Sequence, residues 1–219
     1  EVLASDTLCA NAKYAAIQAT PWASFGKSVK RVTIAADTSR VANVNLNYWF
    51  YSCNALTSVS GMANLRGVAY MNRTFNSCSA LTELDLRGMS LASLSSMLYT
   101  FGACTALERI LVDADWGLPS GCTGSSTFYN CKAIAGGNGT TYDSKQTTYA
   151  MCHIDREGQA GYLTAGERLG TEHNGTPGSC AGALPALLPG VSAPPPWCGL
   201  GDGMRRRVAR TALLLDFGR

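Results

Sequence analysis

The amino-acid sequence predicts an α/β solenoid, in which similar coils stack side by side, from two observations. The first is a phrase of the form aromatic-x-x-Cys-x-Ala-aliphatic, which occurs four times with its phenylalanines 25, 26 and 27 residues apart. The second is a Leu-x-x-Leu-x-Leu pattern that follows the cysteine, most clearly at residues 81–86 and 107–112. The four copies of the phrase occupy residues 50–56, 75–81, 101–107 and 128–134.

Each coil is expected to contain a short helix, a turn and a short strand. The end of the leucine pattern alternates apolar and polar residues, which suits a strand with a buried inner face. Val68, Met71 and Phe75 follow one another at helical spacing, as do residues 94, 97 and 101, so a short helix is predicted before each strand. The repeat length is typical of leucine-rich repeats, and we expect a leucine-rich-repeat-like right-handed coil of about five repeats with short parallel strands, closed by N- and C-terminal caps.

The phenylalanines and cysteines of the phrase are predicted to form two rows inside the stack. They are Phe50, Phe75, Phe101 and Phe128, and Cys53, Cys78, Cys104 and Cys131. Cysteine often packs as a small buried hydrophobe, whereas coils spaced about 4.8 Å apart do not converge on one metal ion. Packing is therefore favoured over disulfides or metal binding, and no metal or cofactor is expected.

Composition divides the chain into four segments. Residues 1–26 do not match the repeat and are predicted to be an N-terminal cap, with a helix that begins at Asp6. Residues 27–135 contain the repeats, and residues 136–165 open on a glycine-rich turn and are predicted to be a C-terminal cap. Residues 166–219 contain six of the eight prolines and are predicted to be a disordered tail or linker. A basic amphipathic helix at residues 205–215, near a membrane surface, is the less favoured interpretation.

The low charge argues against nucleic acid as a partner. The net charge is only +3, and no basic stripe runs through the repeats. No apolar run approaches the length of a membrane span. We therefore expect no nucleic-acid binding, and membrane contact only indirectly, through an anchor outside this chain.

Catalytic chemistry has few candidate residues in this sequence. Cys152 adjoins His153, but neighbours on an extended segment point to opposite faces, while a nucleophile and its base must face each other. Asp113 and Asp115 could share a calcium ion, yet no further ligands follow at the spacing of a calcium loop. The sequence therefore predicts that the protein is not an enzyme.

Residues 21–164 resemble the BspA-like leucine-rich-repeat proteins of bacterial cell surfaces. The matching marks are Pro21-Trp22-x-Ser24 before a Val-x-x-Val-x-Ile strand, the repeated Phe-x-x-Cys-x-x-Leu, and a closing Gly-Gly-Asn-Gly-Thr segment followed by Gly-Tyr-Leu-Thr. The chain departs from this pattern in its glycine-rich fifth coil and at residues 149–155, where the closing segment is longer. The resemblance implies a secreted or wall-attached protein, located outside the cell or on its surface, which binds protein or glycan ligands on host or neighbouring cells.

The solvent-facing residues of successive strands are predicted to form columns that could bind a partner. Aligning the coils places Glu83 beside Arg109, and Arg87 with Met62 and Asp113 in another column. The alternative is that such charge pairs only keep the sheet soluble, each contributing at most about 1 kcal/mol. The candidate binding residues are Arg31, Ser58, Glu83, Asp85, Arg87, Arg109 and Asp113.

Two functions are compatible with this sequence. The first is an adhesin-like recognition module that binds host or partner macromolecules through the strand face of the repeats. The alternative is a structural spacer or stalk segment, which holds another domain of a larger surface protein away from the cell.

Overall fold

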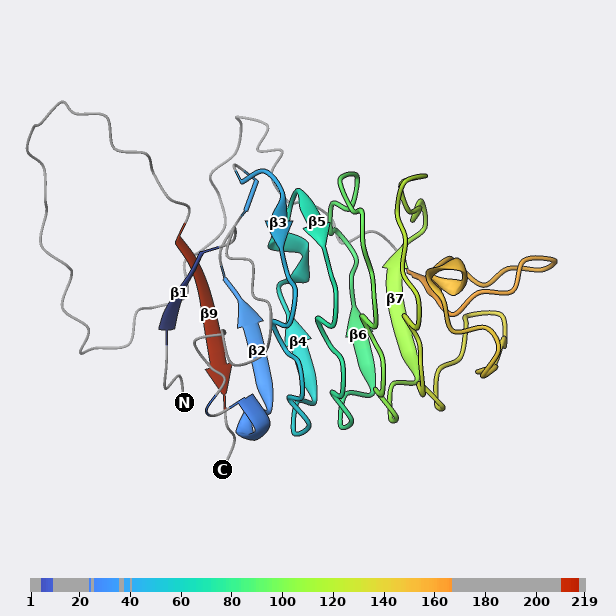
Figure 1. Ribbon diagram of the computed structural model, residues 1–219, viewed down its shortest axis with the longest axis horizontal. Helices are drawn as coiled ribbons and strands as arrows, with labels where there is room; N and C mark the ends of the chain where they lie inside the picture. Colours follow the sequence, from blue (N-terminus) through green and yellow to red (C-terminus); the bar gives the residue numbers. More distant parts are fainter. Residues whose placement is uncertain are drawn as a thin grey trace, which may run out of the picture. The chain divides into compact units, whose positions relative to one another are not determined.

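The computed structural model describes residues 5–9, 24, 26–35, 38–39, 41–166 and 210–216. All of them belong to one of the two units into which the chain divides, the unit of Glu1–Leu169 and Ala209–Arg219. Within this unit, segments about 26 residues apart lie side by side, and their short strands pair (Figure 1).

The main row of paired strands contains the three strands that directly follow a cysteine phrase, with one further strand at each end. They are β2 (Arg31–Ile34), β4 (Ser58–Ser60), β6 (Glu83–Asp85), β7 (Arg109–Asp113) and β8 (Thr164–Gly166). β2 pairs in parallel with β4, and β6 pairs in parallel with β7. Val32 and Ile34 are buried while Arg31 and Thr33 are exposed, because successive side chains of a strand point to opposite faces.

The main row is divided into two sheets between β4 and β6. β4 belongs to a sheet with β2, while β6, β7 and β8 form another. β4 ends after three residues at Gly61, where φ is 79° and the chain enters the 3₁₀ helix Met62–Asn64 (η3). A Cβ atom on residue 61 would lie 2.1 Å from the carbonyl oxygen of Ile34, so this close turn requires glycine.

A second row of backbone pairs runs along the segments that precede the cysteine phrases. β3 (Val44–Asn45) pairs in parallel with β5 (Val68–Tyr70). Single parallel bridges from Tyr70 to Ser96 and from Ser96 to Thr123 continue the row. The second row therefore joins the coil of β4 to the coil of β6, where strand pairing in the main row is interrupted.

Turns occupy the segments where the sequence predicts short helices, which corrects that expectation. Val68–Tyr70 is strand β5, and residues 98–103 form successive turns. Arg73 and Ser77 have φ values of 54° and 64°, which a right-handed helix does not allow. The N–H of Phe75 donates to the carbonyl oxygen of Thr100 in the next coil at 2.9 Å, instead of to a residue one helical turn back. Apolar residues at helical spacing thus point inward here because the chain makes tight turns, not because it forms a helix.

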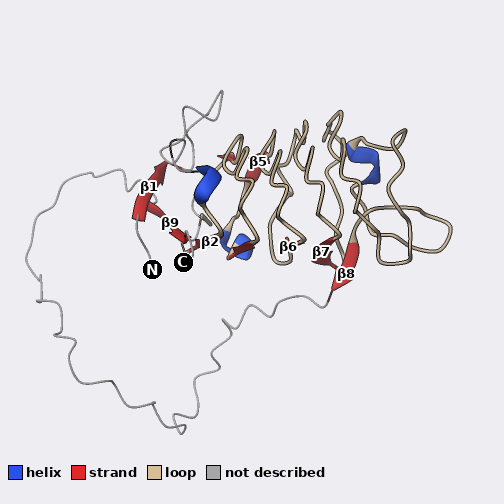
Figure 2. Cartoon of the chain, turned by 90° about the horizontal axis from the view of Figure 1, so that it is seen from below, coloured by secondary structure: helices blue, strands red, loops and turns tan. Residues whose placement is uncertain are grey.

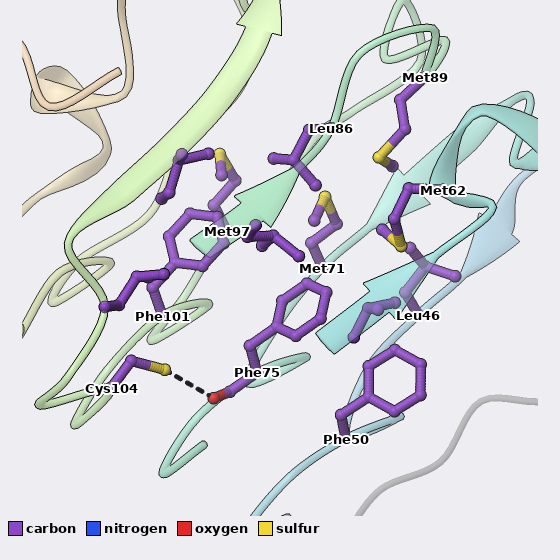
Figure 3. Packing of buried hydrophobic residues seen from close by; sticks show 14 of the residues in the cluster. Leu46, Phe50, Met62, Met71, Phe75, Leu86, Met89, Met97, Phe101 and Cys104 are labelled. Carbon is purple, nitrogen blue, oxygen red and sulfur yellow. Dashed lines mark hydrogen bonds between the residues drawn. The ribbon is translucent and has the colours of Figure 1, made fainter. Parts of the chain in front are cut away.

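The interior is one hydrophobic cluster that extends from Val29 to Leu163. Phe50, Phe75 and Phe101 lie in a row in its central part, and methionine and leucine side chains fill the space beside the rings (Figure 3). Burying one such apolar side chain contributes about 1.5–3 kcal/mol to folding. A continuous core across all the coils therefore replaces a separate core for each.

The edge of β2 is covered by strands from the two ends of the chain. β1 (Ser5–Cys9) and β9 (Arg210–Asp216) pair antiparallel, and β9 also pairs antiparallel with β2 (Figures 1 and 2). β9 thereby satisfies backbone groups of β2 that would otherwise form an open edge. Residues 5–9 are thus a strand where a helix beginning at Asp6 is expected, and residues 210–216 belong neither to a disordered tail nor to an amphipathic helix. The rest of the predicted N-terminal helix and of the tail lies outside the described residues.

The other end of the stack is closed by residues 135–166. The N–H of Ala135 donates to the carbonyl oxygen of Glu108 at 2.9 Å, but the repeat stops at the following glycines. β8 then takes the place beside β7, with Thr164 opposite Leu111. The carboxylate of Asp155 accepts hydrogen bonds from the N–H groups of residues 138, 140 and 161 and from the Thr140 hydroxyl, at 2.7–3.2 Å. Asp155 thereby holds together the loop segments of this end.

Candidate binding surface

Glu83 and Arg109 form an ion pair across two neighbouring strands. They lie opposite each other in the register of β6 and β7. The Nε of Arg109 donates to Oε2 of Glu83 at 2.8 Å, and Nη2 contacts the same oxygen. The Arg109 and Glu83 side chains remain 55% and 45% exposed. Because water screens this pair, it contributes at most about 1 kcal/mol to stability.

Asp85 and Arg87 form a second ion pair beside the first. Arg87 donates from Nε and Nη2 to the two oxygens of Asp85 at 2.9 and 2.7 Å, a bidentate contact that fixes the orientation of the guanidinium. Partial burial raises the pKa of Asp85, but hydrogen bonds from Arg87 outweigh this and hold the pKa below its ordinary value. Hydrogen bonding to Asp85 raises the pKa of Arg87 against the opposing effect of desolvation, and the charges of Asp113 and Glu83 add to the rise.

The predicted column of Met62, Arg87 and Asp113 is not a continuous solvent-facing surface. Asp113 is only 5% exposed, and its Oδ2 accepts a hydrogen bond from the N–H of Gly88 at 2.8 Å. Met62 is buried because η3 turns its side chain into the core. Met62 lies beyond the end of β4, and Asp113 is the last residue of β7, where burial no longer alternates along the strand. Asp113 fixes the turn next to Arg87 instead of presenting a charge to solvent.

Arg31 and Ser58 belong to a different sheet from the charged group. They are exposed and opposite each other on β2 and β4. Since strand pairing is interrupted between β4 and β6, they belong to a different sheet from Glu83 and Arg109. The structure therefore brings Glu83, Asp85, Arg87 and Arg109 together, and leaves Arg31 and Ser58 in a separate pair.

The phenylalanines of the four phrases stack along the interior. The ring centroids are 5.3 Å apart for Phe50 and Phe75, 6.0 Å for Phe75 and Phe101, and 5.4 Å for Phe101 and Phe128. The row continues into the closing segment, where Tyr162 meets Phe128 edge-on at 5.1 Å. Such aromatic pairs contribute about 0.5–1.5 kcal/mol each beyond the area that they bury.

The cysteines of the phrases donate hydrogen bonds to the phenylalanine carbonyls of the preceding coil. The Sγ–O distances are 3.1 Å from Cys78 to Phe50 and 2.7 Å from Cys131 to Phe101. The distance is 2.9 Å from Cys104 to Phe75, the bond drawn in Figure 3. Burial raises the pKa of Cys53 to about 12 and also raises the pKa of Cys78 and Cys131. All six cysteines whose side chains are described carry free thiols. These thiols serve as buried hydrogen-bond donors within the packing.

A row of buried threonines, which the sequence interpretation does not include, runs beside the phenylalanines. Thr74, Thr100 and Thr127 each precede the phenylalanine of a phrase and are fully buried. Their hydroxyls donate to carbonyl oxygens of the preceding coil at 3.0, 2.8 and 3.0 Å. A buried carbonyl without a donor is costly. The recurrence of Thr-Phe in three of the four phrases is the signal that could have identified this row.

Cys152 and His153, the candidate catalytic pair, occupy different environments. Cys152 is buried, and burial together with the nearby Cys122 raises the pKa of its thiol. Nδ1 of His153 lies 3.1 Å from the carbonyl oxygen of the next residue, Ile154. A buried thiol with a raised pKa remains protonated and is a poor nucleophile. The thiol of Cys152 therefore fits a packing position better than a catalytic one.

Comparison with family models, curated proteins and solved structures finds no match to this chain. The relation to BspA-like proteins therefore stays a prediction from the residues of the repeat. Among the described residues, no group of three or more His, Cys, Asp or Glu side chains is placed to hold a metal ion. The helices in the same part of the chain are all too short or too polar to cross a membrane.

Proposed function

We propose that this chain is a non-catalytic, adhesin-like recognition module of an extracellular or cell-surface protein. Its scaffold would be a leucine-rich-repeat-like solenoid, related to the BspA-like surface proteins. It would bind a protein or glycan through the exposed side of β6 and β7. The observation that carries the proposal is the group of four charged side chains on these strands and just after β6, namely Glu83, Asp85, Arg87 and Arg109.

The charged group suits recognition because it is both accessible and held in place. Backbone pairing of β6 with β7 fixes the spacing of Glu83 and Arg109, and the bidentate contact with Asp85 fixes the guanidinium of Arg87. Exposed ion pairs add little to folding stability. Charges of this kind contribute more to partner choice and to the rate of association than to stability.

The alternative is a structural spacer or stalk segment of a larger surface protein. One observation favours it, because the acidic and basic side chains of the group already pair with each other. Such pairs can simply keep the sheet soluble. In this alternative, the role of the stacked coils is to hold another domain away from the cell.

A binding screen with two matched variants tests the proposal. The first variant combines Glu83→Arg, Arg87→Glu and Arg109→Glu, and the control is Lys145→Glu, on an exposed loop outside the charged group. Both variants lower the net charge by two units, so a non-specific effect of charge would affect them equally. Each protein is tested on an array of purified matrix proteins and glycans, and its thermal unfolding is measured in parallel.

The expected result is a ligand that binds the wild type and the control but not the triple variant, with similar melting temperatures for all three proteins. A ligand that binds the triple variant equally well would exclude this face. If the wild type binds nothing on the array, the spacer function is favoured instead.

A further inference from the structure

A row of stacked tyrosine and arginine side chains runs along the turns that precede the cysteines. Cζ of Arg73 lies 5.8 Å from the ring centroid of Tyr48 and 5.2 Å from that of Tyr99. Nη1 of Arg73 donates to the hydroxyl of Tyr48 at 3.0 Å. Tyr99 meets Tyr129 edge-on with centroids 6.0 Å apart, and Tyr129 is 54% exposed. We call Tyr48, Arg73, Tyr99 and Tyr129 the tyrosine–arginine row.

The backbone holds this row in place. Tyr48, Arg73 and Tyr99 occupy equivalent positions in three successive coils, with positive φ values of 62°, 54° and 52°. Their N–H groups donate to carbonyl oxygens of the next coil at 3.1, 2.8 and 3.1 Å. A left-handed conformation is unfavourable for tyrosine and arginine. The repeated hydrogen bonds maintain it and give the three side chains the same direction.

Gly102 provides the space for the ring of Tyr99. A Cβ atom on residue 102 would lie 3.0 Å from Cδ1 of Tyr99 and 2.6 Å from Nδ2 of Asn76. The equivalent positions in two other coils carry the tyrosines Tyr51 and Tyr129. Because the third phrase has glycine here, the Tyr99 ring can lie between Arg73 and Tyr129 without a side chain beneath it.

The spacing of the row matches that of a polyproline II helix. Tyr48 and Tyr99 are two coils apart, which corresponds to about 9.6 Å at the usual spacing of paired strands. A polyproline II helix advances about 9.3 Å in one turn of three residues. Prolines three residues apart in a peptide would therefore meet the two tyrosines in register, with Arg73 between them.

The polar groups of the row are complementary to a proline-rich chain. Within the described residues, the guanidinium of Arg73 makes one hydrogen bond, to Tyr48, out of the five that its N–H groups can donate. A polyproline II backbone has no internal hydrogen bonds, so its carbonyl oxygens are available as acceptors, and proline brings no N–H that would need an acceptor. A glycan hydroxyl can also accept a hydrogen bond from arginine, so an oligosaccharide serves as a control ligand in the test below.

We infer that the tyrosine–arginine row is a binding site for a proline-rich peptide in the polyproline II conformation. Aromatic side chains that present a flat surface to such peptides are a recurring mode of recognition. The row lies on the turns before the cysteines, whereas the charged group lies on the strands after them. Peptide binding at the tyrosine–arginine row therefore does not depend on the charged group that carries the proposed function.

Titration of the full chain with a decaproline peptide tests this inference. Isothermal titration measures affinity, with a glycine-serine peptide of equal length and a chitin oligosaccharide as control ligands. Tyr99→Ala removes the central ring, Arg73→Gln removes the guanidinium, and Tyr149→Ala removes a tyrosine that is 38% exposed outside the row. Circular dichroism checks that each variant is folded, and hydrogen exchange of the wild type locates the bound peptide without any substitution.

The expected result is saturable binding of decaproline alone, with protection at residues 47–52, 72–77 and 98–103. Tyr99→Ala and Arg73→Gln should each weaken it by about tenfold or more, as expected for central contacts, and Tyr149→Ala should not change it. Three results would overturn the inference: no saturable binding of decaproline, protection elsewhere in the chain, or binding of the oligosaccharide alone. The variant with Glu83→Arg, Arg87→Glu and Arg109→Glu should still bind decaproline. The failure of the peptide-binding proposal can therefore be told apart from the failure of the proposed function.

Discussion

Double-mutant cycles in the phenylalanine row test whether neighbouring coils are coupled through direct ring contact. Phe75 and Phe101 stack with an interplanar angle of 15° and centroids 6.0 Å apart, whereas Phe50 and Phe101 are separated by Phe75. A change from phenylalanine to alanine in a core typically lowers the free energy of unfolding by about 3–5 kcal/mol. Replacing either ring by leucine should lower it by less, since most of the buried volume remains. The two leucine substitutions at 75 and 101 should then show a coupling energy of about 0.5–1.5 kcal/mol.

The second cycle, on Phe50 and Phe101, provides the control. Residues that do not touch are additive within about 0.3–0.5 kcal/mol. Free energies of unfolding are measured by urea titration with far-ultraviolet circular dichroism, for the wild type, three single variants and two double variants. Coupling in the Phe50–Phe101 cycle as large as that in the Phe75–Phe101 cycle would refute the idea that contact between adjacent rings carries the interaction.

Three further predictions concern single positions. Burial raises the pKa of Asp155, but the hydrogen bonds that its carboxylate accepts outweigh this effect and hold the pKa below its ordinary value. The carboxylate therefore stabilises the fold fully above about pH 5. This stabilisation is lost as the pH falls below about 4 towards the folded-state pKa. Asp155→Asn should therefore flatten the dependence of the melting temperature on pH in this acid range, and an unchanged slope would contradict the assignment. Gly61→Ala should lower the free energy of unfolding more than Gly139→Ala does. Both glycines have positive φ, but only the Cβ at residue 61 would overlap another atom, the carbonyl oxygen of Ile34. Equal losses in urea titrations would argue against that close contact. Cys104 should react with maleimide in urea but not in the native protein, as detected by peptide mapping, because its thiol is buried; rapid native labelling would disagree with this packing.

The sequence locates the strands because they depend on local pattern and on a fixed repeat. The phrases around Cys53, Cys78 and Cys104 mark where β4, β6 and β7 begin, and aligning the copies gives the pairing of Glu83 with Arg109. The same alignment fails one step later, because Met62 lies past the end of β4 and the alternation of faces breaks at Asp113, the last residue of β7. Strand length depends on the turns, which the pattern of apolar residues does not specify.

The predicted helices fail for a different physical reason. Apolar residues three and four apart point inward from a helix, but they also do so from a chain that turns sharply twice per coil. The turns depend on left-handed residues such as Tyr48 and Arg73, whose side chains carry no intrinsic preference for that conformation. Hydrogen bonds to the next coil impose it, and those bonds exist only once the coils are stacked. For the same reason, the row formed by these residues has no local signature in the sequence.

Strand β9 depends on contacts that are distant in sequence. Its three leucines, Leu213, Leu214 and Leu215, give no alternation that would distinguish a strand from a helix. The strand pairs with β1 and β2, which lie near the opposite end of the chain. β1 and the edge of β2 supply the partner groups, and the edge of β2 is a property of the assembled coils.

The two proposed surfaces differ in the length of ligand that they can read. The pairing of Glu83 with Arg109 joins two adjacent coils, so the charged group spans about one strand spacing of 4.8 Å. The tyrosine–arginine row extends from Tyr48 to Tyr129 across four coils, or about three such spacings. A compact charged group can therefore satisfy the first surface, whereas only an extended ligand can contact the whole of the second. Because the same inter-coil hydrogen bonds fix both spacings, substitutions within the core should weaken both interactions, while substitutions on either surface should weaken only one.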